Sequence, residues 1–201
     1  EAFIAGKTRR AHHPGIVAAP LPERFFPFQA DLVKWALRLG RAALFASTGL
    51  GKSGMEVEWS RQVSDHTGKP VLILTPLAVA AQMVEEGAKI GVPVTLCRDA
   101  VDVRSGVNVI NYDRMHRIDA SVFGGVALDE ASRIKHENSK TLALLLAAFR
   151  DVPYRLSATA TPAPNDYTEL GTQAEFLGIC TRVEMLSEFF VHDGGETQSW
   201  R

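Results

Sequence analysis

One segment limits the possible folds of this chain more than any other, the glycine-rich run Ala46–Ser53. A short apolar run at 42–45 precedes it and is typical of a buried strand, and apolar residues at helical spacing follow it over 55–63. A strand, a glycine-rich turn and a helix, in this order, form the context of a phosphate-binding loop. The segment therefore predicts that a strand–loop–helix unit lies at the centre of the domain.

The residue types in this loop suit the phosphates of a nucleotide. Gly49 and Gly51 let the backbone bend so that its N–H groups face phosphate oxygens. Lys52 can reach the β- and γ-phosphates, and the Ser53 hydroxyl can bind Mg²⁺. Ala46 stands where the usual pattern G-x-x-x-x-G-K-[ST] has glycine. The alternative is a glycine-rich strand–helix turn whose lysine is merely solvated.

Composition is that of an ordinary globular domain. The chain has 201 residues, of which 46% are apolar and 22% are charged, so one domain can bury roughly 70% of the unfolded surface. The formal charge of −1 excludes a global basic field, and a polyanion would need a local basic face. Cys97 and Cys180 lack metal-ligand spacing, and no apolar run is long enough for a membrane span. These features favour a reducing, cytoplasmic location without a membrane partner.

Apolar runs and helical patterns alternate along the chain. The runs that predict strands are 42–45, 71–74, 92–97, 107–110, 124–128 and 154–156. The segments that predict helices are 30–37, 55–63, 77–89 and 142–149. Alternation of this kind predicts an α/β fold with a mostly parallel sheet and helices on both faces.

Unusual polar clusters follow the predicted strands, at 46–53, 75–76, 111–112, 129–130 and 157–159. In parallel α/β sheets, ligands bind outside the carboxyl ends of the strands. The coincidence predicts that all of these clusters belong to one site.

The side chains in these clusters suit nucleotide hydrolysis. Asp129 can hold Mg²⁺ directly or through water, and Glu130 can orient or deprotonate the attacking water. Ser157 and Thr159 could bond the 129–130 turn and register its movement, or they could simply cap a strand. The amide of Gln29, at a predicted helix start, can read the N6/N7 edge of adenine.

These residues together resemble the Q motif and motifs I, Ia, II and III of superfamily-two helicases. The matching segments are Phe28-Gln29, Ala46–Ser53, Thr75-Pro76, Asp129–Ser132 and Ser157–Thr159. The segments 129–135 and 161–165 are particularly similar to the Swi/Snf-like branch, in a compact form common in phages and prophages. Ser132 replaces the histidine of a DEAH box, while 157–159 has the DEAD/DEAH-type helicase form of motif III.

The resemblance implies a RecA-like P-loop lobe that uses ATP and Mg²⁺ in a bacterial or phage-infected cell. Its catalytic residues would be Lys52, Asp129 and Glu130, and its metal ligands Ser53 and Asp129. The implied cofactor-binding residues are Gln29, Thr48, Gly49, Leu50, Gly51, Lys52 and Ser53. Ser157 and Thr159 would couple ATP state to movement. The residues expected to contact DNA, duplex or single-stranded and without reading its sequence, are Thr75, Pro76, Asn111 and Tyr112.

The expected domain organisation has three parts. Residues 1–24 form a basic N-terminal arm, either solvated or in contact with phosphates, and 25–191 form the RecA-like lobe. Residues 192–201 would begin a linker to a second RecA-like lobe that is absent from this chain. That partner lobe would carry motifs IV to VI, including arginines that contact the γ-phosphate.

The resulting hypothesis is the ATP-hydrolysing lobe of a DNA helicase or translocase, weakly active by itself. An ATPase subunit of a restriction-type or nuclease complex would share the same residues. A nucleotide-dependent binding module without hydrolysis has no use for Glu130, and a small-molecule kinase needs an arginine-rich lid that we do not find after residue 130. Two choices stay open at this point: whether the nucleic acid is DNA or RNA, and whether the motor separates strands or translocates on a duplex.

Overall fold

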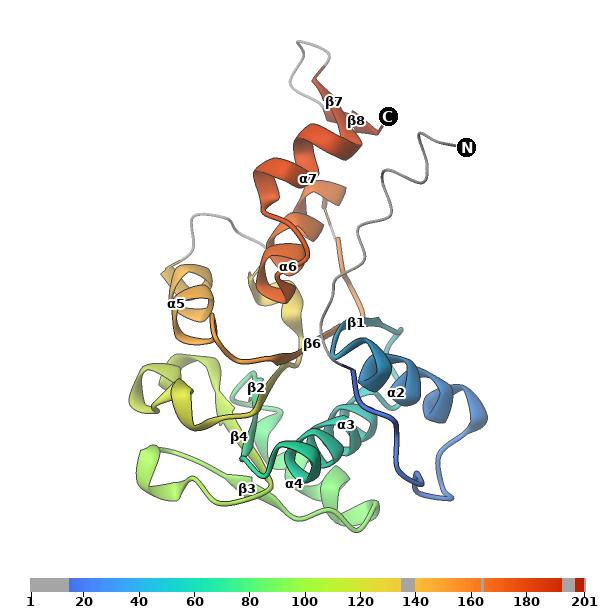
Figure 1. Ribbon diagram of the computed structural model, residues 1–201, viewed down its shortest axis with the longest axis vertical. Coiled ribbons are helices and arrows are strands. Elements are labelled where there is room, and N and C mark those ends of the chain that lie inside the picture. Colours follow the sequence, from blue (N-terminus) through green and yellow to red (C-terminus); the bar gives the residue numbers. More distant parts are fainter. Residues whose placement is uncertain (1–14, 135–139, 164, 193–197, 201) are drawn as a thin grey trace.

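Six parallel strands form one sheet, in the order β1-β6-β5-β2-β4-β3 (Figure 1). The computed structural model describes residues 15–134, 140–163, 165–192 and 198–200. The strands are β1 Arg41–Phe45, β2 Val71–Thr75, β3 Val94–Leu96, β4 Val107–Asn111, β5 Gly125–Leu128 and β6 Tyr154–Thr159. The α/β fold expected from the sequence is confirmed.

The central strands are buried on both faces. Every residue of β2, β4, β5 and β6 is buried. Because successive side chains alternate along a strand, Val71 and Ile73 pack into one core while Leu72 and Leu74 pack into the other. This double burial explains why these strands are continuous apolar runs.

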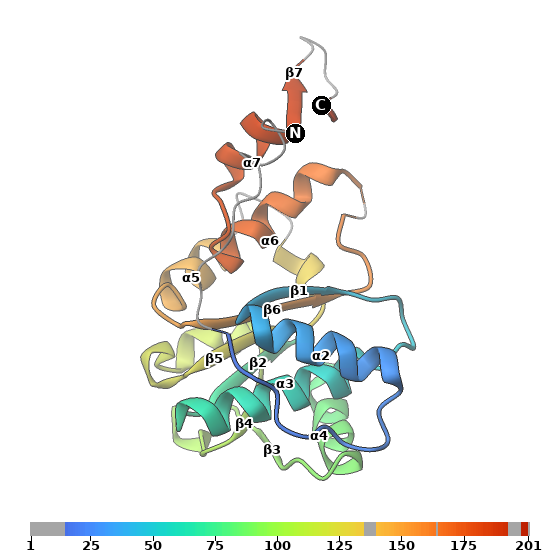
Figure 2. The same cartoon turned by 45° about the vertical axis from the view of Figure 1, so that its right-hand side comes forward.

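Helices cover both faces of the sheet. On one face lie α2 Pro27–Leu39, α3 Lys52–Thr67 and α4 Ala80–Lys89. On the other lie α5 Lys140–Ala148 and α6 Leu170–Leu177, and α7 Arg182–Phe189 follows α6. Figure 2 shows α2, α3 and α4 below β1 and β6, with α5 and α6 above them. The 3₁₀ helices are η1 Ala100–Asp102, η2 Tyr112–Arg117, η3 Ala120–Val122, η4 Ala131–Ile134 and η5 Tyr167–Glu169.

Several boundaries differ from the expected ones for local reasons. Strand β6 continues through Ser157–Thr159, which pair in parallel with Ala43–Phe45 of β1. Strand β3 begins only at Val94, since Pro93 has no N–H to donate to a ladder. Helix α4 begins at Ala80, after a turn in which the N–H of Val79 donates to the Pro76 carbonyl at 2.9 Å.

Two arginines, the buried Arg155 and the half-buried Arg41, link α6 to the sheet. Arg155 donates from Nη1 to the Phe176 carbonyl at 2.6 Å, and Arg41 donates from Nη1 to the Leu177 carbonyl at 3.3 Å. These carbonyls lie in the last turn of α6, where a helix needs external donors. Burial lowers the pKa of Arg155 to about 10.

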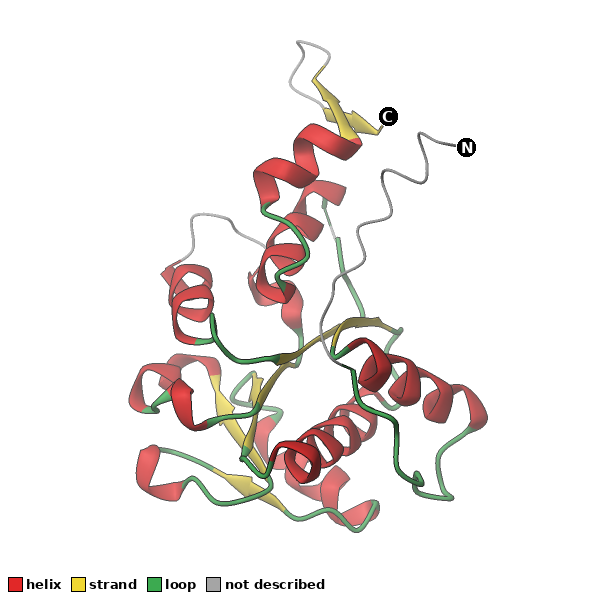
Figure 3. Ribbon diagram, in the orientation of Figure 1, coloured by secondary structure: helices red, strands yellow, loops and turns green. Residues whose placement is uncertain are grey.

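Both ends of the described chain pack in identifiable ways. The N–H of Ile16 donates to the Leu37 carbonyl at 2.8 Å, so the chain before α2 is tied to that helix. The strands β7 Phe190–His192 and β8 Gln198–Trp200 pair antiparallel, away from the main sheet (Figure 3). Strand structure is therefore present within the segment expected to begin a linker. Residues 1–14 of the expected basic N-terminal arm lie outside the described residues, as do 193–197.

Gly87 of α4 is packed too tightly for a side chain. An ideal Cβ at Gly87 would lie 2.6 Å from the Val92 carbonyl oxygen, whereas one at Gly54 of α3 would lie 3.7 Å from Phe25 Cε1. Gly87→Ala should therefore lower Tm. Gly54→Ala should stabilise the fold by up to about 1 kcal/mol, because alanine favours helix. Thermal unfolding followed by circular dichroism compares the two, and shifts of the same sign would contradict this packing.

Candidate functional site

The glycine-rich loop joins β1 to α3 and holds a buried lysine. Gly49 and Gly51 have φ values of 81° and 78°, which favour glycine. Lys52 is buried, and its Nζ donates to the carbonyl oxygens of Ala46 at 2.9 Å and Ser47 at 3.2 Å. The ammonium group therefore lies inside the curve of the loop, with Ser53 next to it in the first turn of α3.

Alanine is compatible with the first position of this loop. Among the described residues, Glu130 is the only non-glycine residue with a positive φ, so Ala46 has a negative φ that does not require glycine. Its N–H donates to the Thr159 carbonyl at 3.3 Å, continuing the pairing of β1 with β6. The departure from the usual pattern thus leaves the loop geometry intact.

Gln29 fastens α2 to the same loop. Its Nε2 donates to the Leu50 carbonyl at 3.0 Å, and its Oε1 accepts from the N–H of Phe26 at 3.0 Å. An ideal Cβ on Gly51 would lie 2.4 Å from Gln29 Nε2, so the close approach of Gln29 requires glycine there. One amide hydrogen and one lone pair of Gln29 are left over from these bonds.

Asp129 connects the ends of three neighbouring strands. Its backbone N–H donates to the Leu74 carbonyl at 2.8 Å, and its Oδ2 accepts from Thr75 Oγ1 at 2.6 Å. Its carbonyl oxygen accepts from the Tyr112 hydroxyl at 2.7 Å. Burial raises the pKa of Asp129, and the hydrogen bond from Thr75 opposes that rise.

Glu130 follows in an unusual backbone conformation. Its φ of 50° is in the left-handed region, and its side chain is half-buried. A non-glycine residue in a sparsely populated region costs about 1–3 kcal/mol and persists where neighbouring contacts enforce it. The next turn, η4, begins directly at Ala131. The carboxylate expected to orient water is therefore held at a constrained turn.

Glu56 is a third acid at this site, and the sequence analysis missed it. The residue is completely buried on α3, and neither carboxylate oxygen has a hydrogen-bond partner among the described residues. Burial raises the pKa of Glu56 well above its usual range, and the nearby Asp129 adds to the rise. The available signal was its position four residues after Lys52, on the same helical face.

Ser157 and Thr159 have partners other than the 129–130 turn. Ser157 Oγ donates to Gln173 Oε1 at 2.8 Å, and Gln173 Nε2 donates to the Pro162 carbonyl at 2.9 Å. Thr159 Oγ1 accepts from the N–H of Thr161 at 3.1 Å. These hydroxyls therefore join β6 to α6 and to the following loop. Ser157 and Thr159 make these contacts in place of the hydrogen bonds to the 129–130 turn that the sequence suggested.

The segments expected to contact DNA border a groove. Thr75, Asn111 and Tyr112 are buried, and the hydroxyls of Thr75 and Tyr112 point to Asp129. Beside them is a groove of about 270 Å³ between the ends of β2, β3 and β4. Its lining residues are Leu77, Ala80, Ala81, Leu96, Cys97, Arg98, Asn111 and Arg114. The arginines at this edge were not identified from the sequence.

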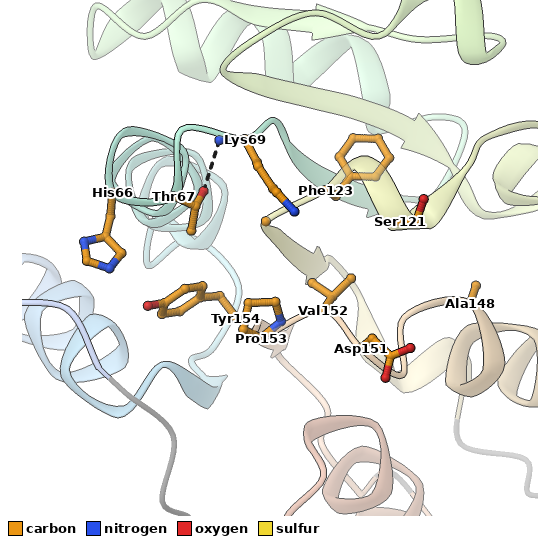
Figure 4. Close-up of a pocket in the computed structure, with 11 residues that line it drawn as sticks. His66, Thr67, Lys69, Ser121, Phe123, Ala148, Asp151, Val152, Pro153 and Tyr154 are labelled. Carbon is orange, nitrogen blue, oxygen red and sulfur yellow. Dashed lines mark hydrogen bonds between the residues drawn. The ribbon is translucent and has the colours of Figure 1, made fainter.

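A separate cavity of about 450 Å³ lies at the opposite edge, where β2, β5 and β6 begin (Figure 4). The rings of His66 and Tyr154 meet there edge to face, with centroids 5.9 Å apart, and Lys69 also lines the cavity. None of the residues predicted to bind nucleotide lines this cavity. It is therefore distinct from the site at the carboxyl ends of the strands.

Comparison with known structures agrees with this architecture. The SWI2/SNF2 ATPase core of Sulfolobus solfataricus in complex with dsDNA aligns with a TM-score of 0.73 and 20% identity, over 87% of this chain and 41% of that one. The chain has a RecA-like fold. The UvsW helicase of bacteriophage T4 aligns over 87% of this RecA-like lobe and 64% of its own chain, with a TM-score of 0.64 and 15% identity. The Hef helicase domain of Pyrococcus furiosus aligns over 75% of this chain and 36% of its own, with a TM-score of 0.63 and 18% identity.

Sequence comparison adds a phage relative. The RecA-like lobe is 26% identical over 176 residues to "Putative protein p41" of Acyrthosiphon pisum secondary endosymbiont phage 1, which covers 75% of this chain and 38% of that protein. The lobe thus spans about two fifths of this relative and of the archaeal ATPase core. No family model matches the sequence.

The described part of this RecA-like lobe has neither a preformed metal cluster nor a membrane-spanning helix. Within the described ranges, no group of three or more His, Cys, Asp or Glu side chains is arranged to hold a metal ion. Mg²⁺ in nucleotide sites needs only one or two protein oxygens besides phosphates and water, so Ser53 and Asp129 fit that pattern. No helix in the described part of the chain is both long and apolar enough to cross a membrane.

Glu56→Gln should stabilise the nucleotide-free protein in a pH-dependent way. A carboxyl group whose folded pKa is raised loses stability as pH rises from the unfolded pKa, about 4.3, toward the folded one. The variant should therefore unfold at higher urea than the parent at pH 8, and this advantage should shrink at pH 5.

Glu58→Gln is the matched control for this measurement. Glu58 is also buried on α3, but it accepts from Arg61 at 2.7 Å and from Gln62 at 2.7 Å. Its replacement removes an ion pair and should destabilise the protein at both pH values. A Glu56→Gln advantage that is equal at pH 5 and pH 8 would contradict the assigned environment of Glu56.

Proposed function

We propose that this chain is the nucleotide-binding lobe of an ATP-dependent DNA helicase or translocase. The observation that carries the proposal is the convergence of Lys52, in its glycine-rich loop, with Asp129 at one edge of the parallel sheet. The similarity to the SWI2/SNF2 ATPase core in complex with dsDNA and to the UvsW helicase supports it.

In this proposal the loop binds the phosphates of ATP. Lys52 now donates to two neutral carbonyl oxygens, and a phosphate oxygen is a stronger acceptor for an ammonium group. Backbone N–H groups of Thr48 to Gly51 and the start of α3 favour the same anion. Ser53 and Asp129 hold Mg²⁺, which neutralises charge on the phosphates.

In this proposal Gln29 contacts adenine, and Glu130 acts on the attacking water. Gln29 keeps one amide hydrogen and one lone pair, which match the N7 and N6 positions of adenine. Glu130 orients or deprotonates water as a general base.

Full activity requires a second RecA-like lobe, in this proposal. Arginines on that lobe stabilise the transition state, and an arginine finger accelerates related phosphoryl transfers by about 10³–10⁵. Residues 1–201 alone are therefore expected to bind nucleotide and to hydrolyse it slowly.

Nucleic acid is proposed to bind along the groove at the ends of β2, β3 and β4. Arg98 and Arg114 line this groove together with Asn111, while Pro76 follows β2 beside it. Arginine contacts to phosphates position a strand without reading its bases, so binding is sequence-independent. Because few phosphates are neutralised, the affinity is weak and its salt dependence is shallow.

Lys52→Ala should weaken the binding of Mg-ADP. Charge-assisted hydrogen bonds contribute about 1.5–3 kcal/mol, which corresponds to roughly a 10- to 150-fold higher Kd. Calorimetry at a fixed Mg²⁺ concentration measures the change. Lys69→Ala is the control, because Lys69 lines the cavity at the opposite edge of the sheet. Equal dissociation constants for Lys52→Ala and the parent would exclude a phosphate-binding role for the loop.

A further inference from the structure

Tyr112 reaches across a strand to the acidic turn. It is the first residue of η2, directly after β4, whereas Asp129 follows β5. Strand β2 lies between β4 and β5 in the sheet, so the hydrogen bond from the Tyr112 hydroxyl to the Asp129 carbonyl spans two strand spacings, roughly 10 Å between strand axes. Only a long side chain with a terminal donor can make this connection.

The bonded carbonyl belongs to the peptide that joins Asp129 to Glu130. A hydrogen bond to this carbonyl fixes the orientation of the whole planar peptide unit, because the unit rotates as one body. The φ of Glu130, 50°, describes rotation on the other side of that peptide. The Tyr112 hydroxyl is therefore placed to maintain the left-handed conformation of Glu130.

The same short helix borders the groove. Arg114 lines the groove and lies in η2 two residues after Tyr112, while His116 and Arg117 of η2 are exposed. The backbone of η2 thus carries Arg114 at the groove and the Tyr112 hydroxyl toward the acidic turn. A polyanion bound in the groove would therefore contact the same element that holds the 129–130 peptide.

We propose that Tyr112 is a positioning residue that couples nucleic acid in the groove to Glu130 through the 129–130 peptide. This inference rests on the proposed function. Ser157 and Thr159 are engaged with Gln173 and with the N–H of Thr161. Thr75 bonds the side chain of Asp129, whereas Tyr112 bonds the carbonyl of the 129–130 peptide itself. The element with two arrangements is the 129–130 peptide, held by Tyr112 in one of them and released in the other.

The proposal is tested by measuring how nucleotide and DNA change each other's affinity for the chain, which needs no ATP hydrolysis. The Kd of Mg-ATPγS is measured on the 201-residue chain with and without a short mixed-sequence DNA duplex, and the Kd of the duplex with and without Mg-ATPγS. Coupling is reciprocal, so both ratios should agree, and we expect about fivefold or more in the parent. In Tyr112→Phe, which loses only the hydroxyl, the ratio should fall to about one, and this ratio rather than either separate affinity is the readout.

Tyr154→Phe is the matched control, since Tyr154 is buried at the opposite edge of the sheet. It should keep the coupling ratio of the parent. A lower Tm for Tyr112→Phe with an unchanged ratio would assign the hydroxyl a purely structural role and overturn the inference. A parent ratio of one would overturn it as well, while failure of the parent to bind ATPγS or duplex would overturn the proposed function itself.

Hydrogen exchange on the unsubstituted chain tests the same coupling, and it does not depend on whether Tyr112→Phe folds. Duplex binding should change the exchange rate of the Glu130 amide, because that N–H belongs to the peptide held by Tyr112. The amide of Ile73, in the centre of β2, is the internal reference. Unchanged exchange at Glu130 in the duplex-bound chain would overturn the coupling.

Discussion

The hydrogen bonds that converge on Asp129 determine the arrangement of the site. The residue bonds Leu74 through its N–H, Thr75 through its carboxylate and Tyr112 through its carbonyl. These bonds place the ends of β5, β2 and β4 around one acidic residue. Since all six strands are parallel, their carboxyl ends lie at one edge, and the glycine-rich loop after β1 opens at that same edge.

This edge concentrates charge that the fold must stabilise. Glu56 and Asp129 are buried acids with raised pKa values, and Lys52 is a buried cation held by carbonyl oxygens. Buried charges are unfavourable unless partners or ligands compensate them. The raised pKa of Glu56 favours its neutral form, which lowers the cost of burying it, and the nearby charge of Lys52 opposes that rise.

Sequence analysis predicted the parts of the fold that depend on burial and on local geometry. The β2 segment is an apolar run because both of its faces are covered, and Gly51 is required by its φ and by the nearby Gln29. Side-chain partners were harder to predict, because they depend on tertiary distances. Helix α6 was not anticipated, so the pairing of Ser157 with Gln173 was not foreseen. The inward direction of Tyr112 likewise follows from packing rather than from local pattern.

A crystal structure of this chain with Mg²⁺ and ADP would test the central claim most directly. The account predicts that the phosphates lie on the 46–53 loop, that Lys52 Nζ has left the carbonyls of Ala46 and Ser47 for a phosphate oxygen, and that Ser53 Oγ lies within about 2.2 Å of the ion. The hydrogen bond from Thr75 to Asp129 should persist. A nucleotide bound elsewhere, for example in the cavity beside His66 and Tyr154, with Lys52 unmoved, would contradict the account.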